Sequence, residues 1–174
     1  MKPPGLAIAM GACAALMGGC ATPPPAADGW LAGRIAVRVE AEPGQAPRQM
    51  SASFELRGRA ERGQMRLYGP LGNTLGEAQW APGEAVLVAP QGRTHYADLE
   101  SLARDALGEP LPLQALPDWL AGRPWPGAAS QGTAEGFEQL GWRIDLQRMA
   151  EGALVAVRAR PPAVTVRVRL DPPT

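Results

Sequence analysis

Three side chains could carry nucleophilic, acid–base or metal chemistry: the single histidine, His95, and the two cysteines, Cys13 and Cys20. A Ser/His/Asp hydrolase would depend on His95 alone as its base, and the chain has no Gly-x-Ser-x-Gly turn to present a nucleophile. One histidine with so few cysteines does not make a zinc site by itself. The sequence therefore predicts a protein that is not an enzyme and holds no metal.

The paired carboxylates do not change this interpretation. Glu40 and Glu42 lie where a predicted strand ends, and Asp98 and Glu100 lie where a predicted helix begins. Carboxylates are common at both kinds of position for structural reasons. We expect no catalytic pair here.

Charge excludes another class of function. The formal net charge is zero, and Lys2 is the only lysine among 17 basic residues. The arginines are scattered along the chain rather than gathered into a basic arm, so no nucleic-acid partner is expected. The 174 residues are 45% hydrophobic and 20% charged, which suits one globular domain.

The N-terminal 19 residues have the layout of a secretory signal. Lys2 precedes an apolar run from Leu6 to Met17, and small residues follow. The run is shorter than the ~20 apolar residues that span a bilayer. The alternative, a buried N-terminal helix, is disfavoured because the segment ends in Gly-Gly-Cys-Ala-Thr-Pro-Pro-Pro, where no helix continues.

The end of this segment, Met17–Cys20, resembles the lipobox of bacterial lipoprotein precursors, although the consensus has leucine where Met17 stands. The resemblance implies that Cys20 is the lipid anchor, carrying S-diacylglycerol and an N-acyl chain after cleavage before it. No other cofactor is expected. Residues 20–29 would be a lipidated Pro/Ala tether. Cys13 leaves with the signal, so no internal disulfide remains. Ala21, which is not the aspartate of inner-membrane retention, points to the outer membrane.

Strand patterns dominate residues 30–174, which we expect to form a single domain. Apolar and polar residues alternate with period two in several short stretches separated by turn residues. The expected strands are 34–40, 51–56, 64–68, 74–80, 85–89, 93–97, 137–147, 154–160 and 163–170. Val155 and Val157 share one face of their strand. In the last strand the valines should face inward and the arginines should face water.

Helical periodicity appears in the middle of the chain. Residues 99–107 place leucines and alanines on one stripe, with Asp98 as N-cap and Gly108 as C-terminal stop. A second helical piece is predicted within residues 111–122, kinked near Pro117. About nine strands and two short helices indicate a mainly β fold, a strongly curved antiparallel sheet or incomplete barrel.

Several motifs occur in an order that resembles the LolB family of outer-membrane lipoproteins, which receive other lipoproteins from the periplasmic carrier LolA. After the lipobox cysteine, the residues that carry the resemblance are Trp30–Arg38, Phe54, Leu67–Thr74, Leu111–Pro124 and Gly141–Ile144. The resemblance implies an incomplete antiparallel β-barrel with a short helical lid over an apolar cavity. The family's usual amphipathic helix before the first strand is short or absent here, since only residues 21–28 separate Cys20 from Gly29.

The resemblance also implies a function and partners. The protein would be lipid-anchored on the periplasmic face of the outer membrane, and we expect a monomer. It would bind the acyl chains of lipoprotein cargo delivered by a LolA-like carrier, and insert the cargo into the inner leaflet. The loop Pro70-Leu71-Gly72 matches the family's membrane insertion loop, whose leucine protrudes. From the residues alone, Leu71 folding back onto the sheet is the other interpretation.

The inward faces of the strands and helices suggest residues that line a cavity, although any of them also suits a plain core. These candidates are Ile35, Val37, Phe54, Leu56, Met65, Leu67, Trp119, Trp142 and Ile144. An alternative function is a structural or assembly lipoprotein of the outer membrane with a solid core, which binds a protein partner. A lipid-active hydrolase is disfavoured by the missing nucleophile.

Overall fold

A computed structural model describes residues 29–44 and 46–172. The predicted signal segment and Cys20 lie outside these residues. The described part contains eleven β-strands, two α-helices and one 3-10 turn. The strands are β1 (Leu31–Val39), β2 (Arg48–Gly58), β3 (Gly63–Tyr68), β4 (Thr74–Ala81), β5 (Glu84–Ala89), β6 (Gly92–Tyr96), β7 (Ser130–Gly132), β8 (Gly136–Gln139), β9 (Trp142–Asp145), β10 (Ala153–Arg158) and β11 (Val164–Leu170).

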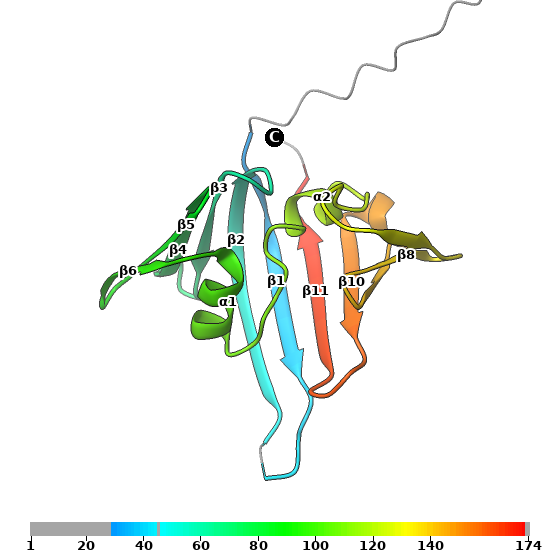
Figure 1. Ribbon diagram of the computed structural model, residues 1–174, viewed down its shortest axis with the longest axis horizontal. Helices are drawn as coiled ribbons and strands as arrows, with labels where there is room; N and C mark the ends of the chain where they lie inside the picture. Colours follow the sequence, from blue (N-terminus) through cyan, green and yellow to red (C-terminus); the bar gives the residue numbers. More distant parts are fainter. Residues whose placement is uncertain (1–28, 45, 173–174) are drawn as a thin grey trace, which may run out of the picture.

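All eleven strands form one antiparallel sheet in the order β6-β5-β4-β3-β2-β1-β11-β10-β9-β8-β7. The sheet curves strongly, and both helices lie on its inner face (Figure 1). Within the described residues β6 and β7 are the two edges and do not pair with each other, so the sheet stays open. The prediction of a mainly β fold with one curved antiparallel sheet is confirmed.

The centre of the sheet follows directly from the alternating sequence. In β1 the buried residues Ile35 and Val37 face Val168 and Val166 of β11. The arginines at alternate positions of both strands, among them Arg34 and Arg169, are exposed on the outer face. Because side chains of a strand alternate between faces, one register buries every valine and exposes every arginine. The prediction that the valines of the last strand face inward and its arginines face water is confirmed.

One predicted strand is in fact a hairpin. The expected strand 137–147 is divided into β8 and β9, which pair through Gln139 and Trp142 around the two-residue turn Leu140-Gly141. Both turn residues have positive φ, 53° and 76°. Such turns usually carry Asn-Gly or Asp-Gly, because few other residues adopt this conformation easily. The Leu-Gly pair is not a usual turn sequence, so the pattern did not predict this turn. The short polar strand β7 was not predicted either.

The strand β10 turns an unexpected side chain inward. Val155 and Val157 share a face as predicted, but it is the outer face, and Val157 is exposed. The inner face carries Leu154, Ala156 and Arg158. Alternation alone does not say which of two faces is buried when one of them carries an arginine.

The helix α1 (Leu99–Leu107) forms as its pattern predicts. Asp98 adopts an extended backbone and accepts a hydrogen bond from the Ser101 backbone N–H, 2.7 Å away. Gly108 ends the helix in the left-handed conformation. The buried residues Leu99 and Leu102 pack on the inner face of the sheet, where α1 contacts β5 and β6.

We expect the N-cap to make folding stability depend on pH. The backbone N–H of Ser101 stabilises the charged form of Asp98 and lowers its pKa below the usual value. A lowered pKa gives stability that is present above the unfolded-state pKa and is lost as pH falls through the folded one. Asp98→Ala should lower the thermal midpoint by about 2–4 °C at pH 7. In calorimetry this difference should shrink below about pH 4. A pH-independent difference would contradict the assignment.

The helix α2 (Leu116–Leu120) is shorter than predicted. Pro117 lies in its first turn and does not kink a longer helix, since proline is tolerated where backbone N–H groups lack helical partners. The preceding residues 109–115 are irregular, although Leu111 and Leu113 are buried. The two helices therefore cover part of the inner face, and an apolar cavity beneath them stays a prediction. Across the described ranges, neither helix has the length and apolar character needed to cross a bilayer.

A buried glutamine fixes α2 to the sheet. The Gln139 side-chain oxygen accepts hydrogen bonds from the Trp119 indole N–H and the Trp125 backbone N–H, each at 2.9 Å. Its nitrogen donates to the carbonyls of Trp125 and Ala128. Because a buried amide is stable only when its polar atoms are paired, this network specifies one position for α2. The sequence pattern gave no sign of it.

Candidate functional site

The loop between β3 and β4 is a hydrogen-bonded turn. The Gly72 backbone N–H donates to the Gly69 carbonyl at 2.9 Å, and the Gly69 N–H donates to the Asn73 carbonyl at 2.8 Å. Pro70 and Leu71 are thus the two central residues, and proline's fixed φ favours the first of these positions. Gly72 has a φ of 78°, which glycine adopts without strain.

Leu71 is the tip of this turn and is 95% exposed. It does not fold back onto the sheet, so that interpretation is excluded. The exposed fractions of the other exposed large apolar residues in the described chain, Trp30, Leu75, Leu140 and Val157, lie between 36% and 41%. A leucine that presents nearly its whole surface to solvent contributes nothing to the core. It is held in place by backbone hydrogen bonds alone.

The nine cavity candidates lie together on the inner face. Eight are buried in the hydrophobic core, and Leu67 is partly buried against it. Trp119 of α2 packs against Phe137 and Trp142, with ring centroids 6.5 and 6.3 Å apart. The structure therefore brings these residues into one apolar surface between the sheet and the helices. Whether they line a cavity stays a prediction.

An ion pair is buried at the rim of this surface. Glu109, which follows α1, accepts from Arg158 of β10 at 2.7 Å and from Arg48 of β2 at 3.0 Å. The side chains of Glu109 and Arg158 are 7% and 5% exposed, whereas Arg48 is half exposed. The Arg158 Nε has no hydrogen-bond partner within the described chain. This cluster joins the segment between the helices to both halves of the sheet.

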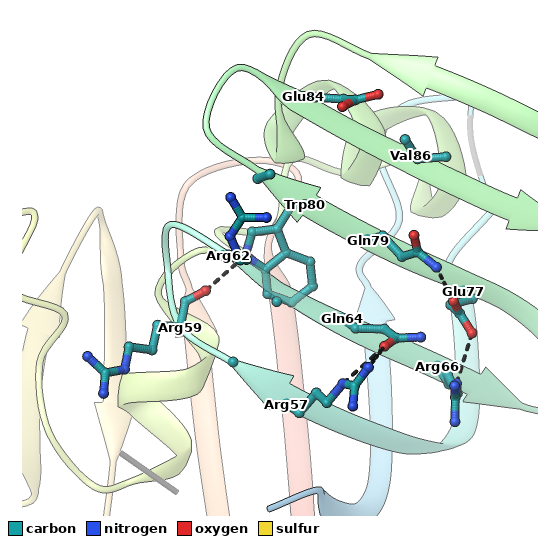
Figure 2. A pocket seen from close by; sticks show the side chains of 13 residues that line it. Arg57, Arg59, Arg62, Gln64, Arg66, Glu77, Gln79, Trp80, Glu84 and Val86 are labelled. Carbon is teal, nitrogen blue, oxygen red and sulfur yellow. Dashed lines mark hydrogen bonds and ion pairs between the residues drawn. The ribbon is translucent and has the colours of Figure 1, made fainter. Parts of the chain in front are cut away.

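The outer face carries two hollows. The first, of about 750 Å³, lies over β2, β3, β4 and β5. Figure 2 shows its polar lining: Arg57 donates to Gln64, and Arg66 donates to Glu77 at 2.8 Å. Arg59 and Arg62 also line it, and their guanidinium groups have no side-chain partner among the described residues. We find no chemistry in this hollow beyond ion pairing.

Trp30 begins the described fold beside that hollow. Its ring lies between the guanidinium groups of Arg57 and Arg66, each 4.5 Å from the ring centroid. Cation–π contacts of this kind contribute about 0.5–1 kcal/mol at exposed sites. They fix the point where the predicted tether meets the sheet.

The second hollow, of about 570 Å³, lies over β1, β2 and β11. Its lining includes Pro70 and three exposed arginines, Arg34, Arg167 and Arg169. The arginines are far apart in the sequence, and only the β1–β11 register brings them together. In the sequence they look scattered, because sequence alone does not reveal the register.

His95 lies on the edge strand β6, and its Nδ1 is 3.0 Å from a Glu84 carboxylate oxygen. Both side chains are more than half exposed. Among residues 29–44 and 46–172, no three histidine, cysteine or acidic side chains are grouped as metal ligands would be. His95 is thus a solvated surface residue.

Comparison with known proteins identifies the family to which this domain is similar. A family model described as "Outer membrane lipoprotein LolB" matches residues 30–171. The chain belongs to the LolB family. The outer-membrane lipoprotein LolB of Bordetella petrii is 34% identical over 95% of this chain and 92% of its own length. The LolB of Ralstonia nicotianae is 36% identical over 79% of this chain and 74% of its own length. The LolB of Chromobacterium violaceum is 40% identical over 58% of this chain and 56% of its own length.

The LolB-family match runs from Trp30, just before β1, to Asp171, just after β11. It therefore includes the exposed turn at Leu71, both helices and the complete inner face. Cys20 lies outside both the match and the described residues, so its role as lipid anchor stays a prediction. The resemblance noted from the sequence is confirmed at the level of the family.

Proposed function

We propose that this LolB-family protein is an outer-membrane-anchored acceptor of lipoproteins. It takes the acyl chains of cargo from a LolA-like periplasmic carrier into the apolar surface between the sheet and the helices. It then releases the cargo into the inner leaflet of the outer membrane. The acyl and diacylglycerol groups on Cys20 hold the domain at that membrane. No chemical reaction of the protein is involved.

The observation that carries this proposal is the exposed tip of Leu71 in a chain that belongs to the LolB family. The names of the relatives place those proteins in the outer membrane as lipoproteins. A leucine held away from the core on a rigid turn is suited to enter a bilayer. Full burial of one leucine contributes about 1.5–3 kcal/mol, enough to orient an already anchored domain.

The inner face supports the acyl-binding step. Each buried methylene is worth ~0.8 kcal/mol, so the chains of a cargo lipoprotein stay covered throughout transfer. The helices cover the apolar surface from one side, and α1 contacts the β5–β6 side of the sheet. In the proposed mechanism acyl chains enter between the helices and the sheet. Leu67 of β3 is only partly buried against the core, which supports placing the entrance beside it.

A fatty-acid probe tests the acyl-binding step. The mature chain, residues 20–174 with Cys20→Ala, should bind an environment-sensitive fatty acid saturably, and unlabelled palmitate should compete. Leu67→Glu should weaken binding about tenfold or more, because it places a charge on an apolar surface. Gln49→Glu, on the outer face of β2, is the matched control and should bind like the parent. Absence of saturable binding by the parent would overturn the proposal.

One observation favours the alternative. Eight of the nine candidate residues are packed in the core, as in a protein with a solid interior. A structural or assembly lipoprotein would instead bind a protein partner along an open sheet edge, β6 or β7. The same probe experiment separates the two functions, because a solid core does not take up the fatty acid.

A further inference from the structure

The arginines of the second hollow have no partners. Within the described residues, Arg34, Arg167 and Arg169 make no ion pair and no hydrogen bond to another side chain. Most other arginines on the sheet are paired, for example Arg38 with Glu40 at 2.9 Å and Arg143 with Glu138 at 3.1 Å. Arg59, Arg62, Arg93 and Arg160 also lack such partners in the described chain, but the second hollow gathers three unpaired guanidinium groups and the first gathers two.

The register makes the arrangement unfavourable in isolation. Arg34 lies directly opposite Arg169 in the β1–β11 ladder, and Arg167 lies opposite Ala36, two residues along β1. Like charges directly opposite each other on one face of a sheet repel. An anion in the hollow would remove this repulsion.

The neighbouring carboxylates of the described residues form no ion pair with the cluster. Arg148 pairs with Glu151 at 2.6 Å and is the main cause of the lowered pKa of that carboxyl, to which the charge of Arg169 adds a smaller part. Glu55, on the same outer face of β2, accepts a hydrogen bond from the Tyr68 hydroxyl at 2.8 Å and pairs with Arg66 at 3.6 Å. The bond to Glu55 raises the pKa of Tyr68. Asp171 follows Arg169 on β11, beyond the hollow, and forms no ion pair in the described chain.

The position of the hollow indicates its occupant. Pro70 lines the hollow and is adjacent to Leu71, so the arginines lie beside the membrane insertion loop of the proposed function. The hydroxyls of Ser51 and Ser53, which also line the hollow, add hydrogen-bond donors. Arginine guanidinium and hydroxyl groups together are suited to bind phosphate.

We propose that this hollow binds the phosphate of an anionic phospholipid headgroup in the bilayer that Leu71 enters. The inference rests on the proposed function, since it takes the turn at Pro70 and Leu71 to face the membrane. Leu71 would reach the acyl layer while the three arginines hold the headgroup layer beside it. Together they would fix the orientation of the domain on the membrane.

Vesicle sedimentation tests the proposal with two charge-matched variants of the mature Cys20→Ala chain. One replaces Arg34, Arg167 and Arg169 with glutamine. The other replaces Arg59, Arg93 and Arg160, which are exposed outside the hollow, with glutamine. An arginine near an anionic surface contributes about fivefold in binding. The hollow variant should therefore lose at least about tenfold on phosphatidylglycerol vesicles, and the control variant much less.

Further measurements distinguish lipid phosphate from free phosphate, and failure of this proposal from failure of the proposed function. Binding to phosphatidylcholine vesicles should be weak and equal for both variants. If inorganic phosphate stabilises the parent against heat with an affinity equal to that for the lipid, the hollow is a site for free anions and the proposal is overturned. Equal losses of vesicle binding by the two variants would also overturn it. Without lipid, the hollow variant should be at least as heat-stable as the parent, because repulsion is removed. The fatty-acid probe should bind both variants equally, so its failure points to the proposed function and not to the hollow.

Discussion

Leu71→Glu should abolish delivery of cargo lipoproteins to the membrane while leaving the fold intact. Leu71 is 95% exposed and outside the core, so the substitution should change the free energy of unfolding by less than about 0.5 kcal/mol. At the membrane the change replaces a favourable apolar tip with a carboxylate that resists leaving water. Reconstituted transfer of a lipoprotein from its carrier into vesicles measures delivery, and growth of a strain that depends on this protein measures it in the cell.

Leu140→Glu is the matched control. Leu140 is also an apolar residue on a tight hairpin turn, and it is 38% exposed. The new charge is the same, but this turn joins β8 and β9 on the other side of the sheet. Delivery should be close to that of the parent protein. If Leu71→Glu supports growth as well as the parent does, Leu71 has no part in insertion.

Glu109→Ala should be the most destabilising single substitution of a charged residue. It leaves the Arg158 guanidinium buried without its carboxylate, and removal of one member of a buried pair costs about 3–5 kcal/mol. Arg48 loses the same partner but is half exposed, so water solvates its charge. Urea unfolding followed by tryptophan fluorescence measures the loss, since Trp142 lies beside Arg158.

Two controls make this result specific. Glu40→Ala breaks an exposed pair with Arg38 and should cost no more than about 1 kcal/mol. Replacing both Glu109 and Arg158 with leucine and methionine removes the buried charges together, and much of the lost stability should return. Equal losses for Glu109→Ala and Glu40→Ala would show that burial of the pair has no energetic weight.

The parts of the fold predicted correctly are those in which a local pattern determines the structure. Period-two alternation identified β1 and β11, and the cap residues Asp98 and Gly108 placed α1 to the residue. The turn around Leu71 followed from proline and glycine at the positions where a β-turn favours them. Each of these features depends on residues that are close in the sequence.

The parts that could not be predicted depend on distant pairs. The meeting of Arg34 with Arg169 requires the register of the first and last strands, which alternation does not give. Gln139 resembled any polar strand residue until α2 and the loop after it surrounded its amide. Arg158 resembled an outward-facing arginine until Glu109 reached it from a loop 49 residues earlier.

The pairing of β1 with β11 also has a consequence for biogenesis. The first and last strands join the two halves of the sheet, so the chain's longest loop closure completes the fold. Before Val164–Leu170 is available, strands β1–β6 and β7–β10 have no ladder between them. The other nine pairings of the described sheet join strands that are consecutive in the sequence, so the β1–β11 ladder is its one long-range step. A nascent chain with this order of strands therefore cannot complete its sheet until Val164–Leu170 has been synthesised, which favours threading through an export channel before the fold is finished.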